Sequence, residues 1–452
     1  MNRRRTPSTI QRPRSSRAGA RTVVVASLAL LVAAGSPVSS RSGNPTPTGD
    51  ERGAAWPAWR GPGGMGIAES SLPAEIDPAS PLWSVTPPGT STSTPIVAGG
   101  RVFLTSQLGT APLARPEPGE DGSGDRQLTF LTLAYDLATG KELWRREIPS
   151  QGELTPVHSK HNLASPSPAS DGERVIAWFG TGQIASYRLD GEVEWQRHLG
   201  AEISPFELRW AHGSSPVILG DRVILLCDHA PAAYLLALDK RTGRQLWKAE
   251  RGTEKRAYST PLVIPDGRGG DLLVVNANER IDAYDPASGE IVWWVGEPNR
   301  VPVPSPVWSG GVLYTSRGYR SGPYMAVRTA GSGDLSDQIL WRHDTGAPYV
   351  PSLLLHRGLL YLATENGVLS AVDAESGATV YRERLGGGFS ASPVAAGERV
   401  VLGNEDGELF VIGAGREFEL HQKVQFDSRL MASPVVVDGR LLVRTDQKLY
   451  AF

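Results

Sequence analysis

The side chains best suited to bind a ligand recur at equivalent places, in the few residues that precede a series of Ser-Pro and Thr-Pro pairs. Arginine and aromatic residues predominate among them. Arginine can form paired hydrogen bonds to a carboxylate, and buried aromatic side chains anchor many protein interfaces. We therefore expect a positively charged rim with aromatic side chains available for stacking. Such a rim suits carboxylates, extended peptides or an acidic partner surface. The candidate binding residues are His161, Asn162, Arg209, Trp210, His212, Arg256, Tyr258, Arg300, Tyr349, Phe389 and Arg429.

A structural explanation of these residues fits the sequence equally well, with each arginine paired to an acid of a neighbouring repeat and each aromatic residue packed locally. His158, His161 and His212 come without a supporting carboxylate pattern, so ordinary surface histidines are favoured over a metal site. The single cysteine, Cys227, excludes an internal disulfide and a thiolate cluster. The sequence has no Gly-rich phosphate loop, Gly-x-Ser-x-Gly elbow or His-Glu-x-x-His motif. We therefore predict neither catalytic residues nor metal ligands.

The first 35 residues differ from the rest of the chain. They contain seven arginines and no acidic residue, and the apolar run 22–32 ends in small residues at 33–35. This order predicts a secretory signal peptide over 1–35, with an uncleaved membrane anchor as the alternative. Residues 36–55 are rich in Ser, Pro, Gly and Thr, and we expect them to form a flexible linker to a domain at 56–452.

Export would place the mature protein in the periplasm or elsewhere in the cell envelope. The net charge of the chain is −2, so the loss of seven positive charges leaves −9. An acidic chain is not expected to bind nucleic acid. We expect contact with a membrane only through the N-terminal segment, if that segment is retained.

From about residue 83 onward, one unit recurs with a period of roughly 40 to 52 residues, which is typical of propeller blades or helical arrays. Each unit contains tight turns, such as Glu-Asn-Gly at 365–367 and Glu-Asp-Gly at 405–407, and closes on Asp, Gly and Trp. Four short strands without helical periodicity predict a β-propeller blade. The units open at Thr94, Ser167, Ser215, Thr260, Ser305, Ser352, Ser392 and Ser433, each followed by Pro except Ser352, which follows Pro351.

The openings and closings together predict the number of blades. There are eight openings but only seven closings downstream of them, at Trp144, Trp195, Trp247, Trp293, Trp341, Tyr381 and His421. The eighth closing lies upstream at Trp83, so a strand at 82–85 should complete the blade that ends at Phe452 and remove the exposed sheet edges. We therefore predict an all-β, eight-bladed propeller of four-stranded antiparallel blades, closed by an N-terminal strand. Seven blades with a decorated edge are the alternative, because Tyr381 and His421 match the repeat weakly.

The long connections fall on one face, with one exception, when this topology is imposed. The joints between blades and those between the second and third strands share a face, which we call the loop-rich face; the other two kinds of joint share the short-turn face. The long segments of the loop-rich face are 107–127, 151–163, 200–213 and 317–324, whereas 329–338 extends the short-turn face. Repeat proteins carry variable loops on the binding side. We therefore expect a partner to bind the loop-rich face.

Two stretches carry a resemblance to a known family. Residues 134–144, Ala-Tyr-Asp-Leu-Ala-Thr-Gly-Lys-Glu-Leu-Trp, and their echo at 283–293 resemble the repeat of pyrroloquinoline-quinone (PQQ)-dependent dehydrogenases. The repeat also resembles that of BamB, the outer-membrane protein assembly lipoprotein, which binds no quinone. Residues 56–62, Trp-Pro-Ala-Trp-Arg-Gly-Pro, resemble the start of exported members of this PQQ-like repeat class. The resemblance implies a propeller but says little about function, because the repeated residues are structural.

The family resemblance leads to two different functional expectations. The dehydrogenases hold the quinone beside calcium with a Glu, an Asn and an Asp, and many have a disulfide between adjacent cysteines, which cannot form here. Asn276, Asn278 and Glu279 are the one compact oxygen-rich group, and a polar hairpin tip explains them more simply. We therefore predict a non-catalytic scaffold of the cell envelope that binds a protein or peptide partner and holds no cofactor. The alternative is a PQQ-dependent periplasmic oxidoreductase.

Overall fold

The computed structural model describes residues 55–452 except 120, 254–255 and 320–321. These residues belong to the compact unit Thr48–Phe452. The predicted signal peptide over 1–35 and all but the last residue of the predicted linker lie outside the described residues. In the described part, no helix is both long enough and apolar enough to cross a membrane.

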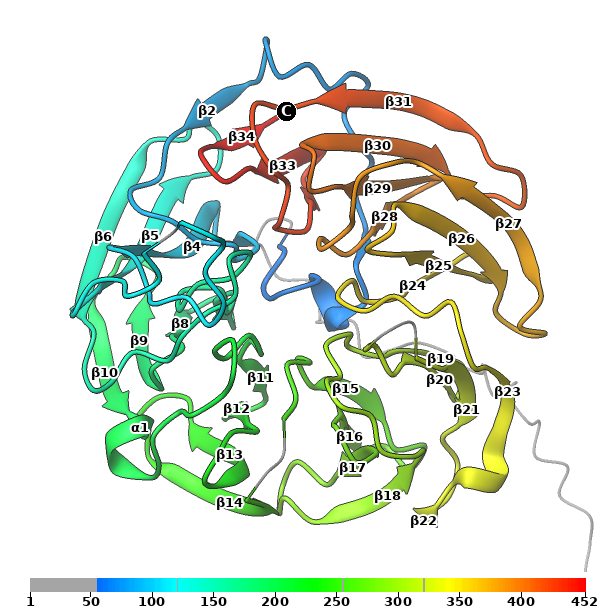
Figure 1. The fold of residues 1–452 in the computed structure, drawn as a ribbon, viewed down its shortest axis with the longest axis horizontal. Helices are drawn as coiled ribbons and strands as arrows, with labels where there is room; N and C mark the ends of the chain where they lie inside the picture. The colour runs from blue at the N-terminus through cyan, green and yellow to red at the C-terminus, as the bar shows by residue number, and fades with distance from the viewer. Residues whose placement is uncertain (1–54, 120, 254–255, 320–321) are drawn as a thin grey trace, which may run out of the picture. The chain divides into compact units, whose positions relative to one another are not determined.

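Eight sheets, each built on four antiparallel strands, follow one another around a ring, and the prediction of an eight-bladed propeller is confirmed (Figure 1). Two of the sheets also have a short fifth strand, β1 or β22, that pairs in parallel. In the first seven blades the unit's first strand lies innermost and its fourth lies outermost. Middle strands such as β12 are apolar and buried along nearly their whole length, because neighbouring blades cover both faces. Blades 1 to 4 consist of β3 (Ile96–Ala98), β4 (Arg101–Leu108), β5 (Thr129–Asp136) and β6 (Glu142–Pro149); β7 (Ala169–Ser170), β8 (Arg174–Trp178), β9 (Gln183–Arg188) and β10 (Val193–His198); β11 (Val217–Leu219), β12 (Arg222–Cys227), β13 (Ala233–Asp239) and β14 (Gln245–Gly252); and β15 (Leu262–Pro265), β16 (Asp271–Asn276), β17 (Ile281–Tyr284) and β18 (Ile291–Val295).

The remaining blades repeat the pattern, and a few short elements decorate the ring. Blades 5 to 7 consist of β19 (Val307–Ser309), β20 (Val312–Ser316), β21 (Tyr324–Arg328) and β23 (Ile339–His343); β24 (Leu354–His356), β25 (Leu359–Ala363), β26 (Val368–Asp373) and β27 (Thr379–Arg384); and β28 (Val394–Ala396), β29 (Arg399–Gly403), β30 (Glu408–Gly413) and β31 (Leu420–Gln425). The additional elements are β1 (Ile67–Ala68), β22 (Gly333–Asp334), α1 (Leu199–Glu202), η1 (Pro62–Gly64) and η2 (Ser336–Gln338).

The ring closes in blade 8 as the sequence predicts. This blade contains β32 (Val435–Val437), β33 (Arg440–Arg444) and β34 (Leu449–Ala451) from the C-terminus, and its outer strand is β2 (Trp83–Val85). Trp83 lies opposite Ala451, and Val85 lies opposite Leu449, in antiparallel register. The last blade is therefore completed by the N-terminal part of the chain, and neither β2 nor β34 is left as a free edge.

The residues that open the units bond to one another around the channel. The backbone N–H of each opening Ser or Thr donates to the hydroxyl of the next opening residue, at 2.8–3.2 Å, until Ser433 donates to Thr94 and the circle is complete. The eight donor and acceptor pairs are Thr94 to Ser167, Ser167 to Ser215, Ser215 to Thr260, Thr260 to Ser305, Ser305 to Ser352, Ser352 to Ser392, Ser392 to Ser433 and Ser433 to Thr94. We call these eight residues the hydroxyl ring.

Five closing tryptophans each join their own blade to the next at the outside of the propeller. Trp195 of blade 2 donates its indole N–H to the carbonyl of Lys240 in blade 3, at 3.0 Å. Its ring covers Gly243, where a Cβ atom would lie only 2.7 Å from the indole and the backbone has a φ of +69°. The same contact recurs for Trp83 on Gly140, Trp144 on Gly191, Trp247 on Gly289 and Trp341 on Gly377. Each of these five glycines therefore leaves room for the tryptophan ring of the preceding blade.

An N-terminal hairpin fills the centre of the ring, where η1 lies in Figure 1. Trp56 pairs with Val97 of blade 1, and β1 pairs in parallel with β28 of blade 7. The Arg60 guanidinium between them is fully buried and donates to the carbonyl of Leu353 in blade 6, at 2.6 Å. Because Trp56 runs antiparallel to β3, the chain enters from the short-turn face and returns to it along β1. We call residues 56–68 the N-terminal hairpin.

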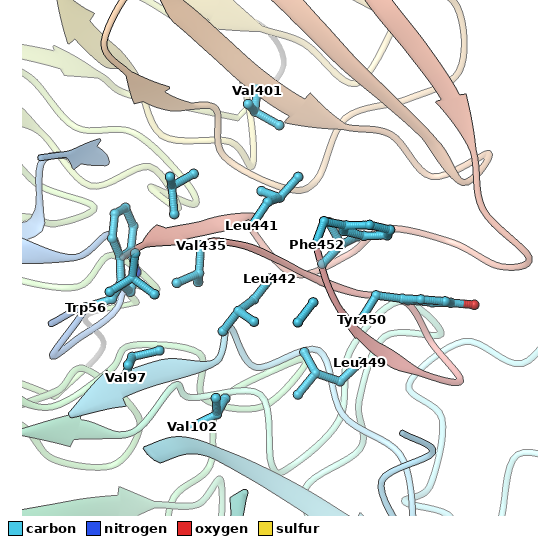
Figure 2. Close-up of a cluster of buried hydrophobic side chains, with 14 of the residues drawn as sticks. Trp56, Val97, Val102, Val401, Val435, Leu441, Leu442, Leu449, Tyr450 and Phe452 are labelled. Atoms are coloured by element: carbon cyan, nitrogen blue, oxygen red, sulfur yellow. The ribbon is translucent and has the colours of Figure 1, made fainter. Parts of the chain in front are cut away.

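Hydrophobic packing fixes the hairpin to the seam where the ring closes. Figure 2 shows Trp56 beside Val97 of β3 and the buried valine and leucine side chains of blade 8. Phe452, the last residue, lies in the same cluster. The N-terminal hairpin and the C-terminal blade therefore share one core.

Substitution of the repeat glycine should test the contact between blades 2 and 3. We expect Gly243→Ala to lower the free energy of unfolding by about 2 kcal/mol more than Gly220→Ala, because overpacking typically costs about 1–3 kcal/mol. Gly220 is the matched control: its φ is also positive, +58°, but no atom lies within 4 Å of an added Cβ. Urea denaturation of both variants measures the difference. Equal losses of unfolding free energy in the two variants would show that the Trp195 ring does not restrict the side chain at this turn.

Truncation should separate the roles of β2 and the N-terminal hairpin. A chain lacking residues 1–90 loses both, so we expect a broad, low-temperature melting transition. A chain lacking 1–78 keeps β2 and should be intermediate, whereas one lacking 1–54 should melt like the full chain. Differential scanning calorimetry measures all three. An unchanged transition after removal of 1–90 would contradict the closure by β2.

Candidate binding site at the mouth of the central channel

Three long loops join into one layer on the loop-rich face. They are the segments 107–127 in blade 1, 151–163 between blades 1 and 2, and 200–213 between blades 2 and 3. Backbone bridges link Leu113 of the first loop to Val157 of the second, and Val157 to Trp210 of the third. The three loops are therefore joined by backbone contacts, and together they form one continuous wall.

A cavity of about 480 Å³ lies beside this wall, at the mouth of the channel. Trp59 of the N-terminal hairpin is one of its lining residues. Valines and Met431 add apolar surface to a lining rich in hydroxyl groups. Six members of the hydroxyl ring line the cavity: Thr94, Ser167, Ser215, Thr260, Ser392 and Ser433.

Four of the predicted binding residues line the cavity: His161, Trp210, Tyr258 and Tyr349. The imidazole of His161 lies 3.3 Å from the carbonyl of His212, and the Tyr258 hydroxyl donates to the carbonyl of Arg209. These bonds hold His161 and Tyr258 in place before any ligand binds.

The four predicted arginines lie on the loop-rich face but do not line this cavity. Arg209 stacks over Trp210, with its guanidinium carbon 4.9 Å from the ring centroid, and Arg300 stacks over Tyr319 at 5.3 Å. Arg429 donates to Asp446 at 2.6 Å. Arg209, Arg256, Arg300 and Arg429 are all exposed. They form an outer rim around the mouth instead of a cationic pocket.

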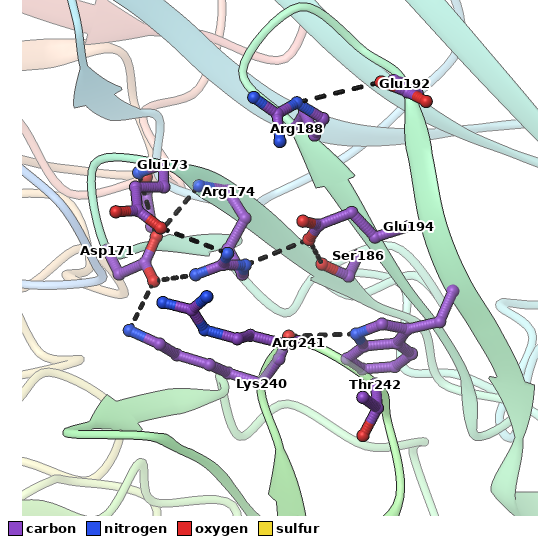
Figure 3. A network of polar contacts seen from close by, with 12 residues as sticks. Asp171, Glu173, Arg174, Ser186, Arg188, Glu192, Glu194, Lys240, Arg241 and Thr242 are labelled. Atoms are coloured by element: carbon purple, nitrogen blue, oxygen red, sulfur yellow. Dashed lines mark hydrogen bonds and ion pairs between the residues drawn. The ribbon is translucent and has the colours of Figure 1, made fainter.

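Other cations make the ion pairs between neighbouring blades. Asp171 in blade 2 is bonded to Arg174 of the same blade and, at 2.7 Å, to Lys240 of blade 3 (Figure 3). The buried Arg251 of blade 3 bonds to Asp228 of its own blade, at 2.7 and 3.1 Å, and reaches Asp282 of blade 4 at 3.5 Å. Of the four rim arginines, only Arg429 has an ion pair among the described residues, and its partner Asp446 lies in its own neighbourhood on blade 8.

Three predicted residues are buried in the protein. Phe389 packs against Phe410 in the core between blades 6 and 7, with no exposed surface. His212 is fully buried and lies against Trp178. The Asn162 side-chain oxygen accepts the N–H of Ala164 at 3.0 Å and shapes the loop. Since none of the three lines the cavity, their position before an opening residue reflects packing and loop geometry.

The charged groups that do line the cavity are ones that the candidate set omitted. They are Lys160, Glu365 and Glu405, accompanied by His158. Lys160 forms an ion pair with Glu405. Burial lowers the pKa of His161 to about 4 and also lowers that of His158, so both imidazoles are neutral at pH 7. Each of the two glutamates begins one of the two Glu-x-Gly turns. The sequence therefore marks their positions, but it identifies them only as turn residues.

Asn276, one member of the predicted oxygen-rich group, is already engaged within the fold and does not fit the role of a ligand to calcium beside a quinone. The Asn276 amide donates to the carbonyls of Pro304 and Ser316, at 2.9 and 2.8 Å, and its oxygen accepts from Arg317. Its hydrogen-bonding capacity is therefore used within the fold. Within the described ranges, no three His, Cys, Asp or Glu residues cluster as a metal site would require. The expectation that no quinone binds stays a prediction.

Acid should destabilise the loop layer through His212. Burial lowers its pKa to about 3, below the unfolded value of about 6.5, so the unfolded chain binds the proton first as pH falls. The stability contribution is complete above pH 6.5, and about 2 kcal/mol of it is lost at pH 5. Urea denaturation at pH 7.5 and pH 5 should therefore show a smaller pH effect for His212→Gln than for the unmodified chain. An identical pH effect would contradict this assignment.

Comparison with known proteins places this arrangement in a family. Residues 74–224, 131–333 and 327–452 match the family described as "Outer membrane protein assembly factor BamB". The protein of that name from Yersinia pestis is 24% identical over 343 residues, covering 71% of this chain and 79% of the relative. The resemblance seen in the repeats is thus confirmed.

Two solved structures share the fold at low sequence identity. BamB from Moraxella catarrhalis has a TM-score of 0.56 at 14% identity, covering 82% of this chain and 96% of that chain. Quinohemoprotein alcohol dehydrogenase from Comamonas testosteroni has a TM-score of 0.61 at 12% identity, covering 88% and 80%. The two functions expected from the repeat thus occur on one architecture, and the fold does not choose between them. Because the family match extends over 74–452, the chain belongs to the PQQ-like repeat β-propellers described as outer membrane protein assembly factor BamB.

Proposed function

We propose that this protein is a non-catalytic scaffold of the cell envelope, exported to the periplasm, that binds a protein partner through its loop-rich face. The observation that supports this most directly is the loop layer, in which backbone bridges join loops of blades 1, 2 and 3 into one wall beside the cavity. A wall held in place before binding has little ordering entropy left to lose on association. The partner would belong to outer-membrane protein assembly, by analogy with the relatives named as assembly factors.

The shape and the chemistry of the mouth support binding rather than catalysis. Trp59 of the N-terminal hairpin lines the cavity, and the hairpin lies in the centre of the ring, so the cavity suits a projecting group. Its lining combines hydroxyls with aromatic rings, which are common anchors at protein interfaces. The exposed arginines around it, Arg209, Arg256 and Arg300, offer further contacts to acidic groups of a partner surface.

Paired substitutions should show which face binds. We expect Arg209→Ala with Arg256→Ala to weaken capture of the partner and to reduce its salt dependence, because both side chains are exposed on the loop-rich face. Each exposed contact is worth only about 0–1 kcal/mol, so a roughly threefold to tenfold loss is expected for the pair. Capture is measured by crosslinking in cells followed by purification, together with the amount of folded outer-membrane β-barrel protein.

The matched control for this experiment lies on the opposite face. Arg241 and Arg268 are exposed on short turns between β13 and β14 and between β15 and β16, so replacing both with Ala should leave capture unchanged. The melting temperature should stay constant in both double variants. If the Arg209 and Arg256 variant instead melts earlier and captures the same partner, these arginines serve the fold and not the interface.

A further inference from the structure

One ion pair crosses the mouth of the cavity between distant parts of the ring. Lys160 belongs to the loop that leads into blade 2, whereas Glu405 lies between β29 and β30 of blade 7. Blades 8 and 1 separate them along the shorter way around. The lysine side chain is 47% exposed, but the glutamate is only 15% exposed. The ammonium group therefore reaches in from the solvent side to a largely buried carboxylate.

The carboxylates at this place outnumber the cations. The second oxygen of Glu405 accepts the Ser390 hydroxyl at 2.7 Å. Glu365, from the corresponding turn of blade 6, also lines the cavity and accepts the backbone N–H of Tyr349 at 3.4 Å. Within the described residues, Lys160 is the one cation whose ion pair reaches either carboxylate. The lining thus has two carboxylates against one ammonium group, and the rim arginines do not offset the difference because they lie outside it.

The uncharged part of the lining favours a cation as well. Trp59, Trp210, Tyr258 and Tyr349 line the same cavity, and the faces of aromatic rings attract ammonium and guanidinium groups. His158 and His161 add little positive charge at neutral pH, because the pKa of each imidazole is lowered. A cation that enters here would meet carboxylates, aromatic rings and hydroxyls, which together suit a lysine or arginine side chain.

We propose that the cavity receives a basic side chain of the protein partner, which takes the place of Lys160 at Glu405 with Glu365 beside it. This inference rests on the proposed scaffold function and names the chemistry of the segment that the cavity recognises. Lys160 acts as the resident occupant: a long, exposed side chain whose ion pair is weak enough to exchange. Trp59 of the N-terminal hairpin, which lies in the centre of the ring, lines the cavity, and this arrangement suits a projecting side chain and its neighbours.

The experiment measures binding of one short peptide to the purified chain. The probe is Gly-Ser-Arg-Ser-Gly, acetylated and amidated at its ends, and its control has citrulline, which is uncharged but nearly the same shape, in place of arginine. We expect the citrulline peptide to bind at least about tenfold more weakly, the size of a charge-assisted hydrogen bond. Isothermal titration calorimetry measures both, in low and in high salt.

Variants of the ion pair should shift the affinity in opposite directions. Lys160→Ala removes the resident competitor and should tighten peptide binding about threefold, whereas Glu405→Gln should weaken it about tenfold. Glu365→Gln should weaken binding too, and it keeps the test valid if Glu405→Gln does not fold. The matched control is Lys423 with Glu408, a pair of nearly equal exposure, 46% and 18%, that does not line the cavity. Lys423→Ala and Glu408→Gln should leave peptide binding unchanged.

The outcomes separate this inference from the scaffold function. Equal affinity for the arginine and citrulline peptides, or the same direction of change in Lys160→Ala and Glu405→Gln, would overturn the basic-ligand assignment. If the peptides fail but the Arg209 and Arg256 variant still loses its partner, the scaffold function stands without this ligand. If both experiments fail, the loop-rich face is not the binding face.

Discussion

The hydroxyl ring is the constraint on which the rest of the propeller depends. Each blade must begin at a residue whose hydroxyl accepts the N–H of the preceding blade, and the last bond, from Ser433 to Thr94, requires the circle to be closed. Only a small hydroxyl side chain meets this need next to the channel. Ser352 shows which part of the opening pair matters, because it takes its place in the ring although the proline precedes it. The ring also fixes which residues lie at the mouth, since the segments just before it end there.

The repeat made most of the fold predictable, since openings and closings can be counted without knowing any contact. The N-terminal hairpin could not be predicted in the same way. Its conformation depends on partners that come together only once the ring exists, such as the Leu353 carbonyl that holds Arg60. The partner of each repeat glycine was equally hidden, because Gly243 and Trp195 belong to different units. Such contacts are set by neighbouring blades and leave no periodic pattern within one unit.

The candidate cavity lies next to the segments from which the rim was predicted, but the sequence does not predict which of their side chains line it. Segments before the openings are loops without a fixed period, so neighbouring positions alternate irregularly between cavity and core. Tyr349 and Phe389 each stand three residues before an opening serine, yet the first lines the cavity and the second packs on Phe410. Tyr349 packs edge-on against Tyr319 of the loop-rich face, with 5.7 Å between the ring centroids, whereas the partner of Phe389 is a residue of the buried core. The two glutamates were assigned to turns because the sequence does not show which turns the loop layer leaves uncovered.

The net charge of the cavity depends on which charged side chains are already engaged in the interior of the fold. Arg60, Arg317 and Arg444 are buried and bind mainly carbonyl or amide oxygens, because inner strands and blade seams expose acceptors that have no strand partner. Burial lowers the pKa of Arg60 to about 9, yet it stays charged at pH 7. These three arginines therefore bind oxygens in the interior and do not pair with the carboxylates at the mouth of the cavity. A chain with a net charge of only −2 can thus present a negative cavity, and the sign of the site depends on packing rather than on composition.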